Sequence, residues 1–438
     1  MAIQLRREGL RVARHTLISS ILQTAIAACA LAQPPGQRLT LGDCIRLAET
    51  APSAVSIARL ERDIAARDAA QARSGFLPQS RLSSGLIYNS PLLYNRQAFS
   101  FVPLNGIREF ASLLTVNQEF DISGRLRADL LRARASRDLA EAGAGITQRD
   151  LRQAVSAAYY RVLLTRRIAR VWQDVLDESR NFERRAGLLV QGGEAARADL
   201  VKASAQTANL QQALNAAELE AKLAIYQLAS FWTKELPETL SLEDVLEDDP
   251  PPPEAEPDQP APFLRRLEFN LLDAQRKGFQ ADARRARASL LPQLNLTFQY
   301  GIDSTAVRIR DRGYAAYFNL TIPLFDWNRA RHAISQARLR GEQTALNRAL
   351  SERLFSQQYR SALARVWQLF EQISLARQQV KLAEEDLRLS RLRYEGGEGA
   401  ALDVVVAQNQ LANARSNYYT ALASYFIARA DLEVAAGR

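Results

Sequence analysis

The chain has 438 residues, 47% hydrophobic and 24% charged, an ordinary composition at a length sufficient for more than one domain. Beyond residue 32 it holds one histidine (His332), one cysteine (Cys44) and no methionine, which excludes His- or Cys-rich metal sites and an internal disulfide. Without the first 32 residues the net charge of +9 falls to about +6 and is spread along the chain, so a solvated Arg/Glu surface is favoured over nucleic-acid binding.

The first 32 residues predict export. Four arginines precede a short apolar run from Thr16 to Ala28, too short to span a bilayer, and Ala30-Leu31-Ala32 offers a small-residue cleavage site. Ile26-Ala27-Ala28-Cys29 also resembles a lipobox, in which Cys29 is lipidated, and both alternatives stay open. No later segment reaches 18 consecutive apolar residues, so a membrane-spanning part has to be a closed β-barrel, the only other fold that satisfies the backbone in lipid.

Internal duplication organises the rest of the chain. Three anchors recur in the same order in both halves: Leu77-Pro78-Gln79 as Leu291-Pro292-Gln293, Phe120-Asp121 as Phe325-Asp326, and Gly192-Gly193-Glu194 with Asp199 as Gly396-Gly397-Glu398 with Asp403. We therefore expect four parts: a signal peptide over 1–32, a first repeat over 33–246, an acidic proline-rich linker over 247–262, and a second repeat over 263–438.

Each repeat is predicted to begin with a helix and two strands. The helices run over 53–76 and 263–289 and stop at Leu-Pro-Gln, because proline removes an N–H donor and clashes with the preceding turn. The predicted strands alternate apolar and polar residues, and their lengths suit tilted membrane-crossing strands: 81–88 and 111–120, then 293–300 and 314–325. A soluble hairpin is the alternative.

Each repeat is then predicted to be helical for over a hundred residues. The long segments are 123–190 and 328–394, and the shorter returning segments are 195–232 and 399–436. At 1.5 Å per residue the long helices reach roughly 100 Å, which implies a coiled coil or a helical barrel. In the last segment, large residues recur every seven positions from Val404 to Leu432, and alanines recur from Ala407 to Ala435, which predicts a left-handed supercoil.

In this order and duplicated, these features resemble the TolC family of outer-membrane efflux proteins over residues 39–436. The most specific pieces are the two Leu-Pro-Gln sequences, Pro323-Leu324-Phe325-Asp326, and Tyr394-Glu395-Gly396-Gly397 leading to Asp403. The resemblance implies an α+β membrane protein. Three copies, with four strands each, form a 12-stranded β-barrel continuous with a long α-helical barrel in the periplasm, and closure removes the sheet edges.

The resemblance also implies partners and a function. The implied assembly is a homotrimer. Its implied partners are a periplasmic adaptor (membrane fusion) protein, an inner-membrane pump of the RND type and outer-membrane lipid, and no nucleic-acid partner is implied. The expected function is conduction of small molecules or ions expelled by the pump. The segments Phe120–Arg125 and Phe325–Arg329 resemble the branch that serves cobalt-zinc-cadmium-type pumps. Alternatives are a duct for type I protein secretion and a non-pore periplasmic coiled-coil protein. No GxGxxG or P-loop pattern occurs, and no cofactor, metal site or enzymatic activity is expected.

The resemblance places a pore constriction at the helical tips. Asp403 matches an acidic position that rings the closed entrance, and Val406 stands at the next acidic position, so one carboxylate ring is expected, favouring cations. Helix N-capping is the alternative role for Asp403 and for Asp199, because a carboxylate there accepts backbone N–H bonds.

The resemblance also implies links between neighbouring helices at the tips. Asp199 and Tyr394 match such positions, and Gly399 replaces the basic partner, for which Arg197 could substitute. Four glycines mark the tip turns where the adaptor docks: Gly192, Gly193, Gly396 and Gly397. Because the second copy carries Tyr394, Asp403 and the alanine-rich seam, we expect the second helical hairpin to move during opening and the first to act as a frame.

Overall fold

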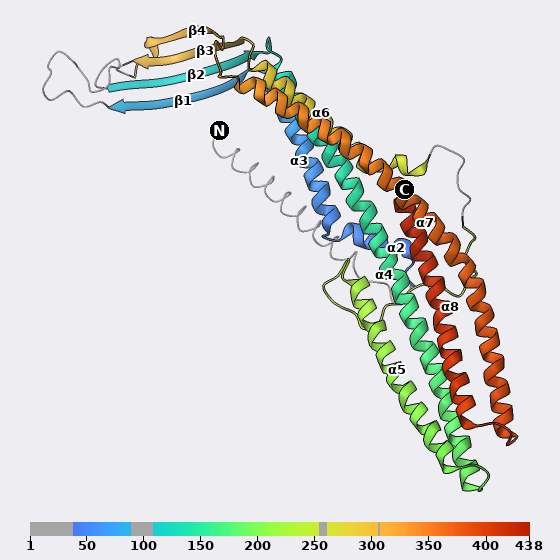
Figure 1. Cartoon of the computed structure of the whole chain (residues 1–438). Helices are drawn as coiled ribbons and strands as arrows, with labels where there is room; N and C mark the ends of the chain where they lie inside the picture. Colours follow the sequence, from blue (N-terminus) through green and yellow to red (C-terminus); the bar gives the residue numbers. More distant parts are fainter. Residues whose placement is uncertain (1–37, 89–107, 254–260, 305–306) are drawn as a thin grey trace, which may run out of the picture.

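The computed structural model describes residues 38–88, 108–253, 261–304 and 307–438. The predicted cleavage site and the predicted lipidation of Cys29 lie outside these residues. The molecule is elongated, with a small sheet at one end and, at the other, the two turns that connect α4 to α5 and α7 to α8 (Figure 1). Its elements are α2 (Leu41–Thr50), α3 (Ala54–Ser74), β1 (Gln79–Tyr88), β2 (Arg108–Phe120), α4 (Arg125–Gln191), α5 (Arg197–Ala229), η1 (Pro262–Arg265), α6 (Leu267–Ala288), β3 (Gln293–Ser304), η2 (Ile309–Asp311), β4 (Arg312–Thr321), α7 (Arg329–Glu395) and α8 (Ala401–Ala435).

The predicted helices and strands are present, with small differences at their ends. β4 ends at Thr321 rather than Phe325, because Pro323 has no N–H donor for a ladder. The helix expected from 263 starts at Leu267, after the 3-10 turn η1 that opens with Pro262. Helix α2 was not predicted, although Thr40 and Asp43 form a capping box, each accepting a backbone N–H of the other at 3.1 Å.

The four strands form one antiparallel sheet in the order β1-β2-β3-β4. Two hairpins, β1–β2 and β3–β4, are joined by pairing of β2 with β3, which brings the two halves of the chain together. Gly301 permits this junction, because a Cβ there would lie 2.0 Å from the carbonyl oxygen of Ser112. β1 and β4 are the edges of the sheet.

The duplicated anchor Phe-Asp has a structural role at the start of each long helix. Asp121 accepts hydrogen bonds from the N–H groups of Leu126 (2.9 Å) and Arg127 (3.1 Å), and Asp326 accepts one from Ala330 at 2.9 Å. These carboxylates satisfy donors that the first turn of a helix leaves unpaired. The duplicated aspartates therefore fix the point at which the chain turns from strand into α4 and α7.

The helices form two levels that share α4 and α7, each 67 residues long. Beside the sheet, contacts run in the order α3–α4–α6–α7, and toward the tips they run in the order α5–α4–α8–α7 (Figure 1). Among the described helices, none combines the length and the apolarity that a membrane span requires. The seam positions Val404, Leu411, Ala407 and Ala414 are buried, as the heptad pattern predicts.

Residues 238–253 pack against α4 and α8, and we call this segment the strap. Leu240, Leu242 and Leu246 are buried in the main core with Tyr159 and Tyr425. The Tyr159 hydroxyl donates to the Glu243 carbonyl oxygen at 2.6 Å, and the Tyr425 hydroxyl donates to that of Pro251. The strap is therefore attached to α4 and α8.

Candidate functional site

The two tip turns have the same backbone geometry. Gly193 and Gly397 adopt left-handed φ angles of 79° and 76°, which favour glycine because a side chain there is strained. The next residues close each turn: the Glu194 N–H donates to the Leu189 carbonyl at 2.8 Å, and the Glu398 N–H donates to the Arg393 carbonyl at 2.9 Å. This Schellman closure ends α4 and α7 and lets α5 and α8 return. The duplicated Gly-Gly-Glu therefore specifies the sharp turns at the tips.

The two aspartates stand in the first turns of the returning helices. Asp403 is exposed, and its carboxylate accepts a hydrogen bond from the Ala400 N–H at 3.3 Å, so it caps α8. Asp199 is half-buried and lies 3.7 Å from the Lys202 ammonium. Both carboxylates lie in the first turn of their helix, where the helix dipole interacts favourably with a negative charge. The capping role predicted as an alternative for Asp403 is thus present.

Tyr394 belongs to an apolar cluster contributed by α4, α5, α7 and α8. Its ring meets Phe182 at 5.1 Å between centroids. Burial, and secondarily the nearby Asp199 carboxylate, raises the pKa of Tyr394. The structure therefore brings Tyr394 near Asp199. Arg197 is exposed and, within the described part of the chain, forms no ion pair with Asp199.

Two ion pairs that the sequence did not reveal flank this aromatic pair. Glu178 on α4 pairs with Arg391 on α7, and Arg185 on α4 pairs with Glu395 on α7. We call the assembly the ladder, which consists of Glu178–Arg391, Phe182–Tyr394 and Arg185–Glu395. Its members lie on α4 at spacings of four and three, the helical face spacing. This spacing on α4 can be read from the sequence. The sequence does not say which other helix that face of α4 contacts.

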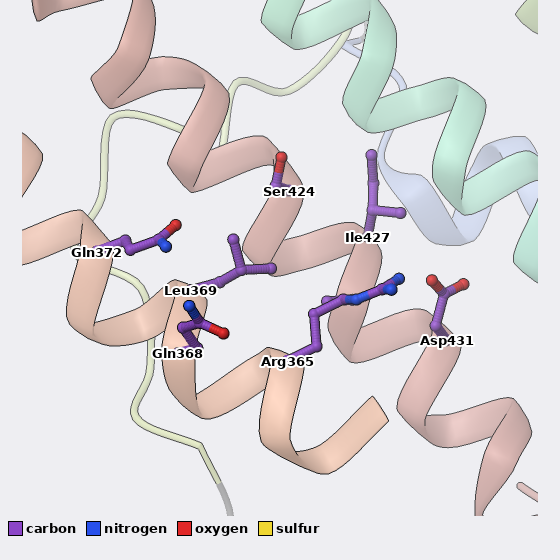
Figure 2. Close-up of a pocket in the computed structure, with 8 residues that line it drawn as sticks. Arg365, Gln368, Leu369, Gln372, Ser424, Ile427 and Asp431 are labelled. Carbon is purple, nitrogen blue, oxygen red and sulfur yellow. The ribbon is translucent and has the colours of Figure 1, made fainter. Parts of the chain in front are cut away.

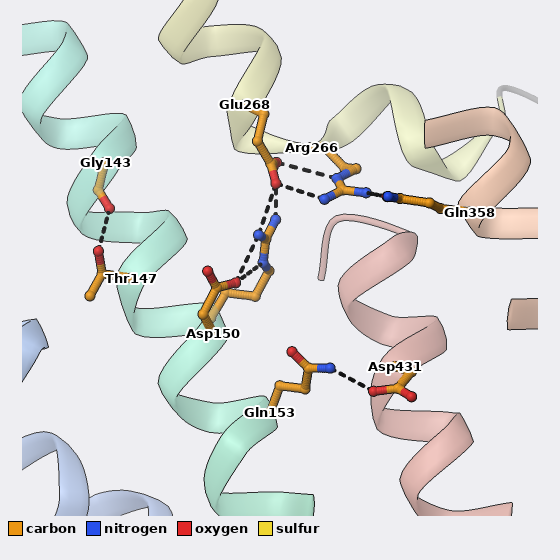
Figure 3. A network of polar contacts seen from close by, with 9 residues as sticks. Gly143, Thr147, Asp150, Gln153, Arg266, Glu268, Gln358 and Asp431 are labelled. Carbon is orange, nitrogen blue, oxygen red and sulfur yellow. Dashed lines mark hydrogen bonds and ion pairs between the residues drawn. The ribbon is translucent and has the colours of Figure 1, made fainter. Parts of the chain in front are cut away.

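A second polar assembly lies at the boundary between the two levels (Figure 3). The Arg149 guanidinium donates two hydrogen bonds to the Glu268 carboxylate, at 3.0 and 2.9 Å, and Arg266 donates two more, at 3.3 and 2.7 Å. Arg266 also donates to the Gln358 side-chain oxygen at 2.8 Å, and its guanidinium carbon stands 3.8 Å from the Phe355 ring centre. This assembly ties α4 to α6 and α7.

An open groove of about 390 Å³ lies between α7 and α8 (Figure 2). Its lining is mixed, with Arg365, Gln368 and Gln372 from α7 and Ser424 and Asp431 from α8. Asp431 is already engaged, because its carboxylate accepts a hydrogen bond from Gln153 on α4 at 2.6 Å. Across the described ranges, no group of three or more acidic, histidine or cysteine side chains is placed to hold a metal ion.

Comparison with known proteins places this architecture in a family. The family described as "Outer membrane efflux protein" matches residues 46–233 and 264–438. The Campylobacter jejuni CmeC outer membrane channel has the same fold, with a TM-score of 0.79 at 17% identity over 91% of this chain and 85% of that one.

Two curated relatives are similar in sequence. The pyoverdine export outer membrane protein OpmQ of Pseudomonas aeruginosa is 26% identical over 70% of this chain, which spans 65% of that relative's length. The cobalt-zinc-cadmium resistance protein CzcC of Cupriavidus metallidurans is 24% identical over 75% of this chain and 77% of its own length. Because the family match covers most of the chain, the protein belongs to the outer membrane efflux protein family, the TolC family of transport channels rather than enzymes.

Proposed function

We propose that three copies of this chain form one continuous duct for small molecules or ions that an inner-membrane pump of the RND type expels through a periplasmic adaptor. Four strands from each copy close a 12-stranded β-barrel in the outer membrane, and the helices continue as an α-helical barrel in the periplasm. The duct conducts without catalysis and without a cofactor. One observation carries the proposal. The edge strands β1 and β4 and the edge helices α3 and α7 expose apolar side chains that no other part of the described chain covers.

The sheet gives the first support. β1 and β4 each have one side without a backbone partner in the described chain, and both carry exposed apolar side chains such as Leu86 and Phe318. Unpaired N–H and C=O groups are costly in lipid, because no water is present to satisfy them. Pairing β4 of one copy with β1 of the next removes every edge once the ring closes.

The edge helices give the second support. α3 and α5 lie at one side of the helical layers and α7 lies at the other. On α3, Ile57 and Ile64 are exposed seven residues apart, and on α7 Leu375, Leu382 and Leu389 repeat the same spacing. A heptad stripe of exposed leucines is the pattern of a helix that packs against another helix. In a ring of identical copies, the α7 edge of one copy packs against the α3 and α5 edge of the next, so neighbouring copies cover both edges.

We propose two structural repeats with the boundaries expected from the sequence, 33–246 and 263–438, preceded by a signal peptide over 1–32 and joined by the linker 247–262. The order helix, two strands, 67-residue helix, returning helix occurs in each half, which supports the division. The returning helices are 33 and 35 residues long. The pseudo-symmetry gives the ring six similar hairpins from three chains.

At the tips we propose that three Asp403 carboxylates, one from each copy, surround the constriction, and that the glycine turns dock the adaptor. Asp403 is exposed beside the second turn, which supports access to passing ions. Asp199, Tyr394 and Arg197 complete the proposed gate region. The relatives differ in the cargo that their names give, so the cobalt-zinc-cadmium-type branch is proposed on the Phe325–Arg329 resemblance and the CzcC similarity.

Recording from the purified trimer in planar bilayers tests the duct. We expect discrete channels with cation selectivity that Asp403→Asn lowers, while Asp386→Asn, which changes another exposed carboxylate on α7, leaves it unchanged. Unchanged selectivity in Asp403→Asn contradicts the carboxylate ring. A protein that never conducts contradicts the duct.

Native mass spectrometry tests the edges. Leu382→Glu places a charge in the exposed α7 stripe and removes about 2 kcal/mol of apolar burial per interface, so we expect monomers. Lys381→Glu, one position outside the stripe and also exposed, is the matched control and should leave trimers intact. Trimers of equal stability in both variants contradict the proposed edge contact.

A further inference from the structure

One face of α7 carries no acidic side chain between Arg329 and Gln372. Residues three or four apart lie on the same face of a helix, because one turn has 3.6 residues. We call one such face the polar face, and it consists of positions 329, 332, 336, 340, 343, 347, 351, 354, 358, 361, 365, 368 and 372. Apart from Leu354, its members are arginine, histidine, glutamine, asparagine or serine, and all except the half-buried Ser351 are exposed. The polar face therefore offers about 65 Å of hydrophilic surface.

The charge of the polar face is positive. Arg329, Arg340 and Arg365 lie on it 11 and 25 residues apart, close to three and seven helical turns, so they form one straight row. All three are exposed, and within the described residues none of them forms an ion pair. The acidic residues of the same stretch lie on other faces of α7, and they are Glu342, Glu352 and Glu371. The row therefore holds positive charge that no neighbouring carboxylate neutralises.

The connection between the two repeats lies on a different side of α7. Pro253 at the end of the strap and Pro262 at the start of η1 line a small cleft of about 120 Å³ together with Tyr359, Leu363 and Val366 of α7. At about 100° per residue, these three α7 positions are centred roughly 130° around the helix from the polar face. Three such connections inside a ring of copies would obstruct a duct, so the side of α7 that bears them faces outward. The polar face then faces the interior.

The polar face continues on α8 toward the tip. Arg365, Gln368 and Gln372 form one wall of the groove between α7 and α8, and Ser424 belongs to the other wall (Figure 2). Ser424 stands three heptads after Asp403, so both lie on the same side of the supercoiled α8. The exposed polar residues between them on this side are Gln410, Asn413, Asn417 and Thr420. Along this surface the side chains therefore change from acidic at the tip, through neutral and mostly amide groups, to basic near the sheet.

We propose that the polar face lines the interior of the duct and binds solutes that carry carboxylate or phosphate groups, with the groove as the place where one such group settles. This inference rests on the proposed duct and names the chemical class of its solute. An arginine guanidinium donates paired hydrogen bonds to a carboxylate or phosphate, and glutamine amides donate to the remaining oxygens.

The groove has donors that are available for such a ligand. The side chains of Arg365, Gln368 and Gln372 have no hydrogen-bond partner within the described residues. The lining also includes Asp431, whose carboxylate already accepts a hydrogen bond from Gln153 at 2.6 Å. The row of arginines lies much farther from the tip than the Debye length of about 8 Å, so its charge acts independently of the carboxylates there.

Cysteine labelling tests which side of α7 faces the interior. Arg340→Cys replaces a member of the row, and Arg338→Cys, two positions away and also exposed, replaces an arginine off the polar face. In the purified full-length trimer, a small maleimide should label both variants. A maleimide on a polyethylene glycol chain of several kilodaltons should label the Arg338→Cys variant and be excluded from the Arg340→Cys variant. Cys44 is buried and does not contribute. Equal labelling of both variants by the polymer overturns the interior placement.

Citrate, a tricarboxylate, tests the binding chemistry of the groove. Broadening of its proton NMR signals by the purified trimer reports binding without any current. We expect Arg365→Gln to raise the Kd for citrate by about two- to fivefold, the range for one solvent-exposed ionic contact. Arg360→Gln is the matched control, because Arg360 is also exposed on α7 but lies off the polar face, and it should leave the Kd unchanged. Equal effects of the two substitutions overturn the assigned site.

Bilayer recordings separate failure of this inference from failure of the duct. Citrate should reduce the current through a conducting trimer, and Arg365→Gln should raise the citrate concentration that is needed by the same factor as the Kd. A trimer that never conducts but binds citrate through Arg365 contradicts the duct alone. A conducting trimer whose citrate binding is unchanged by Arg365→Gln overturns the inference and leaves the duct standing.

Discussion

Glu268 holds two buried arginines together, and its substitution has a calculable effect. Burial by itself raises the pKa of Glu268, but hydrogen bonds from Arg149 and then Arg266 lower it from the ordinary 4.5 to about 2. The side chain is only 21% exposed, so solvent screens these contacts weakly. Each pKa unit corresponds to about 1.4 kcal/mol, so the ionised carboxylate contributes about 3 kcal/mol to the free energy of unfolding of each protomer.

The direction of the pH dependence of stability follows from the lowered pKa of Glu268. The folded protein holds the carboxylate ionised more strongly than the unfolded chain does, so the stabilisation is fully present above about pH 4.5 and is lost as the pH falls toward 2. Glu268→Gln should therefore lower the melting temperature at pH 7 by about 3 °C, given an unfolding entropy of about 2.1 cal/mol/K per residue. The difference from wild type should shrink steadily below pH 4.5.

Thermal unfolding of the detergent-solubilised trimer, followed by circular dichroism between pH 3 and pH 7, measures this effect. Asp150→Asn is the matched control, because Asp150 binds the same Arg149 guanidinium from a side chain that is 54% exposed. An exposed ion pair contributes at most about 1 kcal/mol, so the control should shift the melting temperature by about 1 °C or less. Equal shifts in both variants, or a Glu268→Gln deficit at pH 3 as large as the deficit at pH 7, would refute the reasoning.

Three further experiments probe the core, a tip and the seam. Burial raises the pKa of the Cys44 thiol to about 12, so maleimide should label Cys44 only after unfolding, as mass spectrometry would detect. Gly193→Ala should lower stability by about 1–2 kcal/mol because of its left-handed φ, whereas Gly192→Ala, at φ −73°, should not, as melting curves would show. Ala414→Leu should cost about 1–3 kcal/mol by overpacking a buried seam position, while the exposed Asn413→Leu should change the melting temperature little.

Features that depend on the spacing of residues within one segment were predictable from the sequence. The long helices, the buried alanines Ala407 and Ala414, and the glycine turns follow from spacings within one segment, and the structure has them within a few residues. The two-strand hairpins were also found, because Leu-Pro-Gln and Phe-Asp bracket them. The family resemblance rested on the order of these local features, and the family match over residues 46–233 and 264–438 agrees with it.

Features that depend on which faces meet were not predictable. Glu178 and Arg185 are two among many charges on α4, and nothing in the sequence says that their partners are 210 residues or more away on α7. The hydrogen bonds around Glu268 likewise join α4 to the start of α6. Helix α2 was missed although its Thr40 capping box is local, because the helix is only ten residues long and precedes the first repeated anchor.

The attachments of the two hairpins are unequal, and this inequality bears on which of them moves. α4 is held by α2, where Gln148 donates to the Glu49 carboxylate at 2.9 Å, and by the strap, where Arg167 pairs with Asp244 at 2.6 Å. The second hairpin has no counterpart of α2 in the described residues and meets the strap through Tyr425 and Arg377. Toward the tips it is joined to the first hairpin by the ladder and its surrounding apolar cluster. Fewer attachments outside its own helices lower the cost of displacing the second hairpin, so we propose that the first hairpin acts as the frame and the second as the moving part.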